Sequence, residues 1–387
     1  MQNIIITNAK IIGCQKWQKI LINEQGIIEG IVDTSLDVDS MKICKVYDAR
    51  GDWVSLGGLD LQINGALGLS FTDIDKTQIP KLREICDFLW KQGVNSFLPT
   101  IVTTSIENIQ NSLSTIKQFI EIQNRENNQT AQVLGVHLEG PFLNYQKKGA
   151  HSFHYLLEPS IDSVQLILED YEDVVKIITL APELDKTLKV IPYLLSKKII
   201  VSLGHSQANA EEAKTAFAMG ASMVTHAYNA MPSLHHRQPG LLGEAIINNK
   251  VSCGLIADGH HVCTTMMDLL LRSSSYHKGI FLVSDALAPI GLGDGIYPWD
   301  NREIEVIKGT ARLADKTLAG TTLSLFVGVQ NLVNWEICSP EIAIALATES
   351  PRKAINLPGI SIGQPAHLIQ WYWDQLNNQL SWRRIEV

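Results

Sequence analysis

The sequence predicts an α/β protein, a (β/α)8 barrel of the TIM type with a small β-sandwich domain built from both chain ends. Short apolar runs that end in polar residues recur through the middle of the chain, helix-like segments separate them, and both ends carry only β-type runs. Eight such units over roughly 250 residues is the expected size of this barrel. We predict residues 1–54 with 358–387 as the small β domain and residues 55–357 as the catalytic barrel.

Composition narrows the classes of function. Of the 387 residues, 45% are hydrophobic and 19% are charged, which is typical of a folded globular chain. The formal net charge of −8 argues against a nucleic-acid partner, which needs a basic face. No apolar run reaches spanning length and the first residues lack a signal-peptide pattern, so we expect a cytoplasmic protein with no membrane partner. The six scattered cysteines, without a CxxC pair, fit reduced and buried thiols.

The two chain ends have similar patterns. Residues 3–12, 19–32 and 42–54 are short β-branched runs separated by Gly, Asn and Asp, without helical periodicity. Residues 359–387 alternate apolar and polar positions. Since chain termini often lie close together, both ends can form one antiparallel β unit beside the central body.

The central body alternates strands with helices. A doubly wound sheet would need a Gly-rich phosphate turn after an early strand, but the only early Gly-rich turn begins before its strand. The predicted helices include residues 80–93, 106–124, 184–198, 207–220 and 264–275. The eight predicted strands are residues 56–64, 94–100, 132–140, 174–182, 199–206, 222–229, 251–258 and 279–286.

Two histidines end neighbouring predicted strands. His205 ends the fifth strand and His226 the sixth, and the Ala-rich helical segment between them stops at Gly220. A strand–helix–strand unit makes a right-handed parallel crossover, so both imidazoles reach the same edge of the sheet. The pair is consistent with half of a metal site, although a lone strand-end histidine is more often a hydrogen-bonded structural residue.

Acidic residues at other strand ends favour the metal hypothesis. Glu139 ends the third strand, Asp258 the seventh and Asp285 the eighth. Glu139, His205 and His226 supply one carboxylate and two imidazoles, a ligand set that catalytic zinc uses with a fourth position for water. Such a metal lowers the pKa of its water to about 7. Asp285 can then take a proton from that water and return it to a leaving group.

Several longer segments resemble a known family. They are LGGLDLQINGALG, GVHLEGPFLNYQKKGAHS, SLGHSQANAEEA, THAYNAMPSLHHRQPG, ADGHHV, LVSDA and LAGTTLSL. In this order, from about residue 55 to residue 357, they are similar to N-acetylglucosamine-6-phosphate deacetylases of the amidohydrolase superfamily. The resemblance implies a homodimeric, metal-dependent amide hydrolase of amino-sugar catabolism. Activated water would attack the acetamide of N-acetyl-D-glucosamine 6-phosphate, with Asp285 as general base and acid and His151 stabilising the oxyanion.

The first strand indicates how many metals bind. Many amidohydrolases carry an HxH pair there, where this sequence has Gln62, Ile63 and Asn64. Side-chain amides are poor zinc ligands, so we expect Gln62 and Asn64 to act around the water and behind the ligands. The lysine that bridges two metals in other amidohydrolases has no evident counterpart, and Glu139 takes the comparable role. One divalent metal per subunit is expected, Zn²⁺ first, with Fe²⁺, Mn²⁺ and Co²⁺ as alternatives.

The resemblance also implies contacts to the sugar phosphate. Arg237 matches a phosphate contact, which suits its bidentate geometry, and His261 matches another contact that a neighbouring subunit can supply. An arginine in such a loop is also often only a solvated charge, and Gly320 can serve only a turn. The other expected contacts are Ala150, His151, Asn229, Ala230, Asp258, Leu318, Ala319 and Gly320.

Some basic residues keep two interpretations. Lys147 and Lys148 can steer an anion or form a solvated surface. The histidines at positions 235, 236 and 260 are expected to be loop residues. His367 stands where the superfamily usually has Asp, in a G-x-x-A-D-L pattern, and we expect it to affect packing of the small β domain more than chemistry.

Two competing hypotheses remain. A different amidohydrolase, such as a cyclic-amide hydrolase, would normally keep the HxH pair and the bridging lysine, and neither is apparent here. A non-catalytic relative that serves as a binding module would have lost a metal ligand or the acid of the eighth strand. Glu139, His205, His226 and Asp285 are all present.

Overall fold

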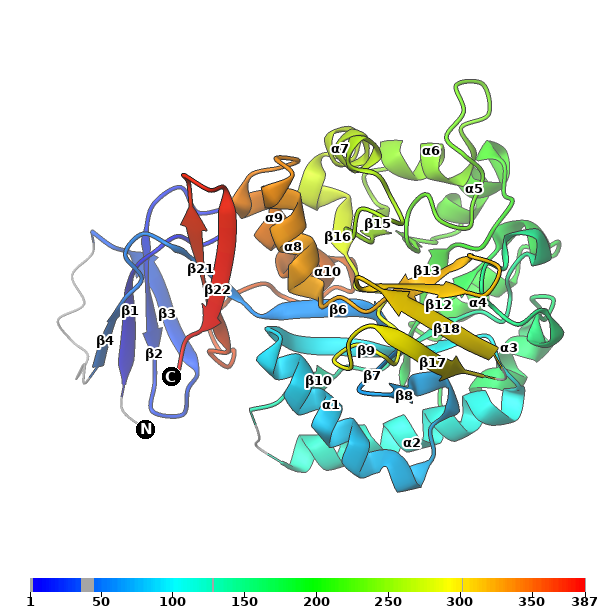
Figure 1. Ribbon diagram of the computed structural model, residues 1–387, viewed down its shortest axis with the longest axis horizontal. Coiled ribbons are helices and arrows are strands. Elements are labelled where there is room, and N and C mark those ends of the chain that lie inside the picture. The colour runs from blue at the N-terminus through cyan, green and yellow to red at the C-terminus, as the bar shows by residue number, and fades with distance from the viewer. Residues whose placement is uncertain (1–2, 36–44, 127–128, 301, 387) are drawn as a thin grey trace.

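Eight parallel strands form a nearly closed barrel, shown in Figure 1. The computed structural model describes residues 3–35, 45–126, 129–300 and 302–386. An isolated bridge between Ile63 and Ala286 brings the first barrel strand back to the last, which confirms the predicted barrel. In barrel order the strands are β6 (Gly58–Ile63), β9 (Val94–Val102), β11 (Val136–Glu139), β12 (Val175–Leu180), β13 (Ile200–Leu203), β14 (Met223–Val224), β15 (Ser252–Leu255) and β16 (Ile280–Leu282).

Helices cover the outside of the barrel. Among the described residues, none of them is long and apolar enough to cross a membrane. Local capping explains where several begin: Ser105 caps α2, and Asn209 forms a capping box with Glu212 at α5. They are α1 (Ile79–Lys91), α2 (Ile106–Arg125), α3 (Ile161–Leu168), α4 (Val190–Ser196), α5 (Ala210–Ala218), α6 (Gly240–Ile247), α7 (Thr264–Ser273), α8 (Leu325–Asn334), α9 (Pro340–Ala347) and α10 (Glu349–Ala354).

One helix is shorter than the sequence predicts. The expected helix over residues 184–198 begins only at Val190. Asp185 accepts hydrogen bonds from the backbone N–H groups of Thr187 and Val190, and Leu188 has a left-handed φ of +56°. Side-chain bonding of this kind competes with helix formation, so the segment before Val190 is a turn.

Both chain ends build the small β domain. A first sheet has the order β3–β2–β1–β4 and a second has β22–β21–β5, with an isoleucine-rich core between them that includes Ile6, Ile20 and Leu368. This confirms the predicted β domain, but β4 pairs with β1 in parallel, so the unit is not wholly antiparallel. Its strands are β1 (Ile4–Ala9), β2 (Gln18–Ile22), β3 (Ile28–Asp33), β4 (Lys45–Asp48), β5 (Trp53–Leu56), β21 (Leu368–Asp374) and β22 (Gln379–Arg384).

Two sequence expectations need comment. Residues 42–44 of the third predicted β run lie outside the described residues, and the domain boundaries stay a prediction.

Five described cysteines are free thiols, but Cys14 and Cys263 are exposed. The expectation of buried thiols is therefore wrong for these two, because Cys14 lies in the loop between β1 and β2 and Cys263 is the N-cap residue of α7.

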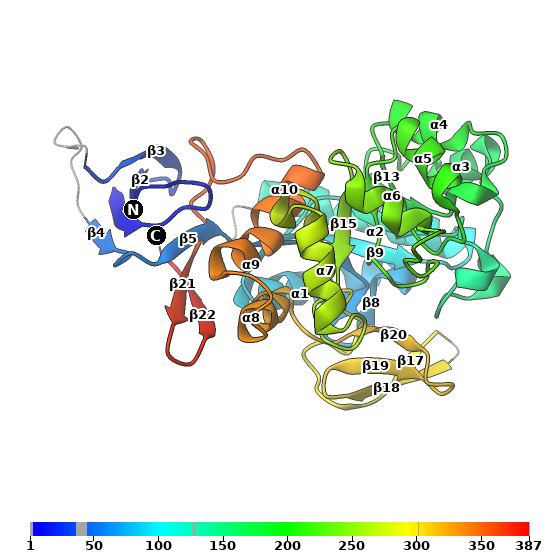
Figure 2. The same ribbon diagram turned by 90° about the horizontal axis from the view of Figure 1, so that it is seen from above.

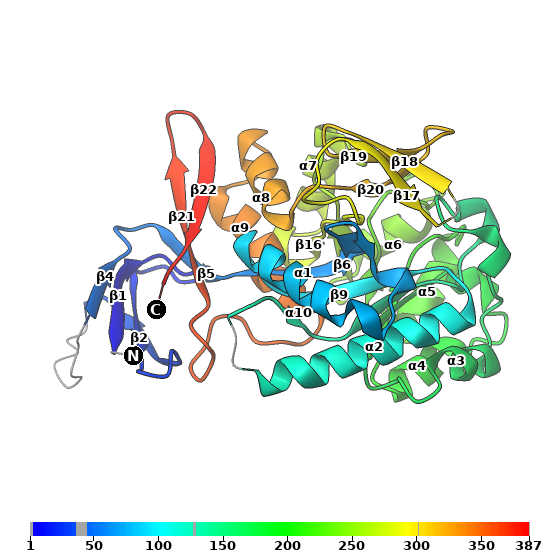
Figure 3. The same ribbon diagram turned by 60° about the horizontal axis from the view of Figure 1, so that its bottom comes forward.

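An antiparallel sheet that the sequence analysis did not predict follows the last barrel strand. Its strands run in the order β17–β18–β19–β20 and lie over one side of the barrel, as Figures 2 and 3 show. A two-stranded ribbon of β7 (Gly65–Ala66) and β8 (Leu69–Ser70) follows the first barrel strand. The inserted strands are β17 (Gly295–Trp299), β18 (Arg302–Ile307), β19 (Thr310–Leu313) and β20 (Leu318–Thr321).

A half-buried arginine, Arg384, joins the small β domain to the barrel. Arg384 donates hydrogen bonds to the carbonyls of Trp90 and Val94 and to Asn95 Oδ1, at 2.7–3.2 Å. Its guanidinium carbon lies 3.5 Å from the centre of the Trp90 ring, and burial lowers its pKa to about 9. His367, at the position that departs from the superfamily, packs edge-on against the same ring at 4.9 Å. The residue therefore lies in a packing contact between the two domains.

Replacing Arg384 tests this junction. Arg384→Met keeps an apolar stem over Trp90 but removes the three hydrogen bonds, so we expect a loss of about 2–4 kcal/mol in the free energy of unfolding. Denaturant unfolding measures this loss, and turnover should be unchanged. Arg383→Met, at the exposed neighbouring position, is the control and should cost less than about 1 kcal/mol. Equal losses in both variants would contradict the role of Arg384.

Candidate metal centre

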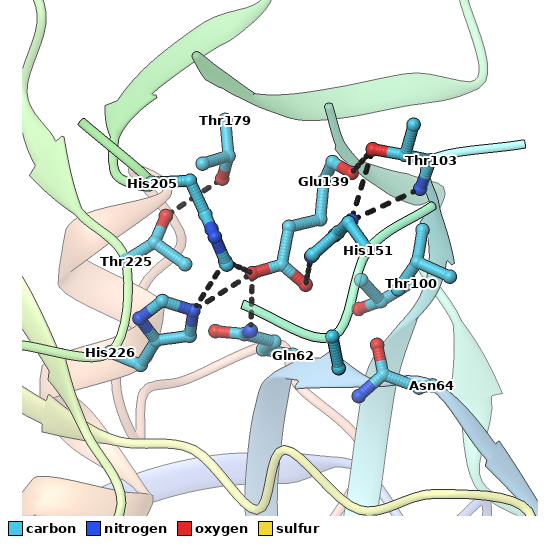
Figure 4. Close-up of polar contacts among 12 residues, drawn as sticks. Gln62, Asn64, Thr100, Thr103, Glu139, His151, Thr179, His205, Thr225 and His226 are labelled. Carbon is cyan, nitrogen blue, oxygen red and sulfur yellow. Dashed lines mark hydrogen bonds and ion pairs between the residues drawn. The ribbon is translucent and has the colours of Figure 1, made fainter. Parts of the chain in front are cut away.

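Three side chains meet at the carboxyl edge of the barrel. Glu139 ends β11, and His205 and His226 follow β13 and β14, as Figure 4 shows. Glu139 Oε1 lies 3.2 Å from His205 Nε2 and 3.0 Å from His226 Nε2, and the two nitrogens are 3.0 Å apart. Ligand atoms held at 2.0–2.2 Å from one tetrahedral Zn²⁺ lie roughly 3.3 Å apart. The three atoms thus have nearly the spacing of ligands to a single ion.

The protonation of these three side chains is consistent with a cation bound between them. His205 Nδ1 lies 2.7 Å from the carbonyl of Lys147 and must donate to it, so in the neutral ring Nε2 is the nitrogen that offers its lone pair toward Glu139. A lone pair and a carboxylate this close need a proton or a metal cation between them. Burial alone would raise the pKa of Glu139, but the contacts with His205 and His226 hold it well below its usual value. Burial opposes charge on His226, yet the hydrogen bond to Glu139 raises its pKa.

His151 lies beside this group but differs from its members. Glu139, His151 and His205 offer ligand atoms that all lie within 4.8 Å of one another, so distance alone permits a metal role for His151. Its Nδ1, however, accepts a hydrogen bond from the backbone N–H of Thr103, which assigns the ring proton to Nε2. That N–H faces the site 3.9 Å from Glu139 Oε2. His151 is therefore placed as a hydrogen-bond donor, and the tighter triangle with His226 is the better ligand set.

Asp285 lies next to the ligands and is held by two amides. Its Oδ1 accepts hydrogen bonds from Gln62 Nε2 at 3.1 Å and from Asn64 Nδ2 at 2.8 Å. Gln62 Nε2 also donates to Glu139 Oε1 at 3.1 Å, so one amide joins the two carboxylates. Burial, and then the negative charge of Glu139, raise the pKa of Asp285 to about 7. The residues in place of the HxH pair thus orient both carboxylates.

The backbone is strained at three of these residues. His205, His226 and Asp285 have φ angles of +47°, +27° and +47°, in the left-handed region that non-glycine residues rarely adopt. All three lie two or three residues after a parallel strand, where the chain turns sharply over the edge of the barrel. The turn directs their side chains toward one another.

A cavity of about 330 Å³ opens above these residues. Most of the contacts expected from the sequence line it: Asn64, Glu139, Ala150, His151, His205, His226, Asn229, Ala230, His261, Asp285, Leu318 and Ala319. Lys147 also lines it, while its amino group donates to the carbonyl of Met231 at 3.0 Å.

Three predicted site residues lie behind the cavity wall. Gln62 is buried below the ligands. Asp258 accepts a hydrogen bond from His261 Nδ1 at 2.7 Å and so positions that ring rather than lining the cavity. Gly320, in β20, has a φ of +153°, and a Cβ there would come within 2.7 Å of the Asp285 carbonyl oxygen. It permits close packing of the inserted sheet on Asp285.

Arg237 lies away from this cavity. It is exposed, in the loop between β14 and α6, and it borders a separate hollow of about 580 Å³ beside α5. His235 and His236 lie in the same exposed loop. Within one chain, the structure does not bring Arg237 to the predicted site.

Other residues around the site were not predicted from the sequence. Glu183 follows β12 and accepts hydrogen bonds from Asn144 Nδ2, Ser206 Oγ and the Gln207 backbone, so it ties the loop after β11 to the loop that carries His205. The strand-end rule, applied to the fourth barrel strand, could have found it. Val102, Gln146, Gly149, Ile256, Leu287, Trp299 and Thr317 also line the cavity.

Comparison with known proteins decides the family. The N-acetylglucosamine-6-phosphate deacetylase of Rattus norvegicus is 35% identical over 318 residues, which cover 80% of this chain and 76% of that protein. This chain belongs to the N-acetylglucosamine-6-phosphate deacetylase family of the amidohydrolase superfamily. It is therefore an enzyme, a hydrolase that acts on amide bonds, as the resemblance implied.

Other relatives agree with this assignment. An N-acetylgalactosamine-6-phosphate deacetylase of Escherichia coli is 32% identical over 338 residues, covering 86% of this chain and 83% of that protein. The crystal structure of the N-acetylglucosamine-6-phosphate deacetylase of Pasteurella multocida superposes with a TM-score of 0.83 at 27% identity, over 99% of this chain and 100% of that one. No protein-family model matches the chain.

Metal analysis tests the ligand set. Glu139→Gln replaces the one anionic ligand by a poor one, so we expect metal content to fall from one equivalent per chain to roughly a tenth or less after dialysis, as measured by plasma mass spectrometry. Asp258→Asn is the control, because Asp258 contacts His261 and not the three ligands, and it should keep the metal. A full equivalent in Glu139→Gln, or two in the unaltered protein, would contradict the single site.

Proposed function

We propose that this chain hydrolyses N-acetyl-D-glucosamine 6-phosphate to acetate and D-glucosamine 6-phosphate, in amino-sugar catabolism. The convergence of Glu139, His205 and His226 beside Asp285 carries the proposal, because it assembles an amide-hydrolysing site in a chain whose relatives bear this name. A non-catalytic relative would not keep all four, and a cyclic-amide hydrolase would not have Gln62 and Asn64 at the first strand.

We propose one divalent cation per subunit, held by Glu139, His205 and His226, with Zn²⁺ first and Fe²⁺, Mn²⁺ or Co²⁺ as alternatives. When bound, it would polarise the acetamide carbonyl and lower the pKa of a water molecule. Side-chain amides are weaker zinc ligands than the imidazoles of an HxH pair, and those of Gln62 and Asn64 are used as donors to the two carboxylates. This supports one ion rather than two.

Asp285 is proposed as general base and then general acid. Both amide donors go to Oδ1, which leaves the other oxygen of the carboxylate for a proton. A pKa of about 7 suits this work, because a group titrating near neutral pH can both accept and return a proton. The proton would come from the attacking water and go to the departing amine.

His151 is proposed as the donor that stabilises the oxyanion. Its Nε2–H faces the cavity, since Nδ1 is engaged by Thr103. Burial, with the neighbouring His205, lowers its pKa to about 3, so the ring stays neutral and acts as a hydrogen-bond donor and not as an acid. A fixed donor in a water-poor site stabilises developing charge without reorganisation.

The sugar phosphate is proposed to lie on the side of the cavity formed by the loops after β14 and β15. Asn229 and Ala230 follow His226 and line the cavity, as do His261, Leu318 and Ala319. The hydrogen bond from His261 Nδ1 to Asp258 fixes the orientation of the His261 ring in this wall. Lys147 adds a cation at the same wall, and these groups together suit a phosphorylated ring.

We further propose a homodimer in which the exposed loop of Arg237 reaches the phosphate in the neighbouring subunit. Within one chain Arg237 borders a different hollow, so its predicted contact requires a second copy. We also propose a cytoplasmic location, which the free thiols of the five described cysteines support.

Acetate release from the metal-loaded protein, with and without Asp285, tests the proposed function. The unaltered protein should release acetate from N-acetylglucosamine 6-phosphate. Asp285→Asn should lower kcat by roughly 10³-fold, because it removes the base but can keep one hydrogen bond, while the metal is retained. Turnover close to that of the unaltered protein would remove Asp285 from the reaction.

The choice of sugar separates the remaining hypotheses. N-acetylgalactosamine 6-phosphate belongs in the same assay, since a relative at 32% identity carries that name. Faster release from the galactose epimer would replace the proposed substrate and keep the reaction. No acetate from either phosphorylated sugar, with one metal bound, would overturn the deacetylase proposal.

Arg237 has a separate test. Arg237→Ala should raise KM for the phosphorylated sugar by roughly 10- to 100-fold, because a charge-assisted hydrogen bond to phosphate is lost, and should leave KM for unphosphorylated N-acetylglucosamine unchanged. His236→Ala, the exposed neighbour, is the control. An equal rise in KM for both sugars would show that the loop acts on folding or assembly rather than on phosphate.

A further inference from the structure

A second, smaller hollow lies against the main cavity. It measures about 150 Å³ and shares four lining residues with the cavity: Asn64, Val102, Leu287 and Trp299. These four residues therefore form a partition between the two spaces. Beyond this partition, the smaller hollow, which we call the annex, is bordered by the turn after β7 and by Pro298 and Asp300 of the β17–β18 hairpin.

The partition lies at a defined place around the barrel. Asn64 and Val102 are at the ends of the first and second barrel strands, β6 and β9, and Leu287 follows the eighth, β16. Asn229 and His261, the proposed sugar contacts, follow the sixth and seventh strands, β14 and β15. In a closed barrel of eight strands the sixth and seventh lie across from the second and third. The partition and the proposed sugar contacts after β14 and β15 thus lie on opposite sides of the proposed metal ligands and Asp285.

The geometry of a secondary amide then orients the substrate. Such an amide is trans, so the acyl carbon chain and the sugar carbon point to opposite sides of the C–N bond. With the carbonyl at the metal ligands and the sugar toward β14 and β15, the acyl group points toward Asn64 and Val102. Its methyl group meets the apolar part of the partition, which Val102, Leu287 and Trp299 supply.

We propose that Trp299 is the specificity-determining residue that limits the acyl group to acetyl. This rests on the proposed function, because it places the carbonyl carbon at the three metal ligands. The ring closes the space beyond the methyl group, and the annex behind it is wide enough for further methylene groups once the ring is removed. The reaction with a longer chain is the same: water adds, the C–N bond breaks, and the carboxylate and the amine leave.

Trp299 is held in place by a contact between the hairpin and the loop of His151. Trp299 and Arg302 face each other in the β17–β18 register, and the guanidinium carbon lies 4.9 Å from the centre of the indole ring. Arg302 Nη2 donates to the carbonyl of Ala150 at 2.9 Å, and the guanidinium also pairs with Asp300. Since Ala150 precedes His151, the wall and the proposed oxyanion donor are fixed to each other.

The experiment compares three acyl groups on glucosamine 6-phosphate: acetyl, propionyl and butyryl. Free amine released by the metal-loaded protein gives kcat/KM for each. The unaltered protein should prefer acetyl to butyryl by roughly 100-fold or more, since each methylene that must be fitted costs about 10-fold or more. Trp299→Ala should lower this acetyl-to-butyryl ratio by roughly 10-fold or more. The change should come from a higher kcat/KM for butyryl and not only from a lower kcat/KM for acetyl.

Two further variants keep the test decisive. Val102→Ala opens the same partition from a different strand, so it should shift the ratio in the same direction, and it decides the matter if Trp299→Ala does not fold. Ile296→Ala removes a side chain of β17 that is 66% exposed and points to the other face, and it should leave the ratio unchanged.

The outcomes are distinct. A ratio that stays constant in folded Trp299→Ala, or in Val102→Ala where Trp299→Ala does not fold, would overturn the proposal, as would an unaltered protein that accepts butyryl as readily as acetyl. An unaltered protein that releases amine from none of the three compounds would instead overturn the proposed function.

Discussion

Two buried carboxylates that share one amide set the conditions for the whole site. Glu139 and Asp285 are both buried at the base of the cavity, and Gln62 Nε2 donates to each of them at 3.1 Å. Two negative charges so close cannot have the same proton affinity in a medium of low dielectric constant. The pKa of Glu139 is held far below its usual value by the two imidazoles, while that of Asp285 rises to about 7. One carboxylate is thereby fixed as a permanent anion and the other is left able to exchange a proton.

The histidines of the site depend on backbone groups for which ring nitrogen carries the proton. The Lys147 carbonyl fixes the proton of His205, and the Thr103 N–H fixes that of His151. A chain of side chains below them, from His137 to Thr179 and Thr225, is joined by hydrogen bonds of 2.7 Å inside the barrel. The position of each loop therefore decides which nitrogen offers a lone pair, so the chemistry of the site follows from the tertiary fold rather than from the ligands alone.

Local pattern was enough to predict the barrel and the polar residues that meet at its carboxyl edge. An apolar run followed by a polar residue can be recognised within a few positions, and His205, His226, Glu139 and Asp285 all occur in that context. The inserted sheet was not predicted, although the alternation of Arg302–Ile307 is typical of a strand. Ile304, Val306 and Ala311 form a small core of its own with Leu287, apart from the main core of the barrel, and Pro298 in β17 weakens the strand pattern there.

Other residues could not be placed from local pattern. Trp299 lines the cavity only through tertiary packing, and Asp258 acts through His261. Arg237 could not be placed either, because its exposed loop borders a different hollow and the proposed phosphate contact would need a second copy of the chain.

The division of the small β domain between the chain ends has a consequence for biosynthesis. Ser55 accepts a hydrogen bond from the Trp371 indole, a partner 316 positions later in the chain. When the first strands leave the ribosome, the sheet that covers their apolar face has not been made, and it is completed only by β21 and β22. The barrel can close while it is being translated, whereas the isoleucine-rich face of the first sheet must wait for the end of synthesis. That face is the part of the nascent chain with most need of a chaperone.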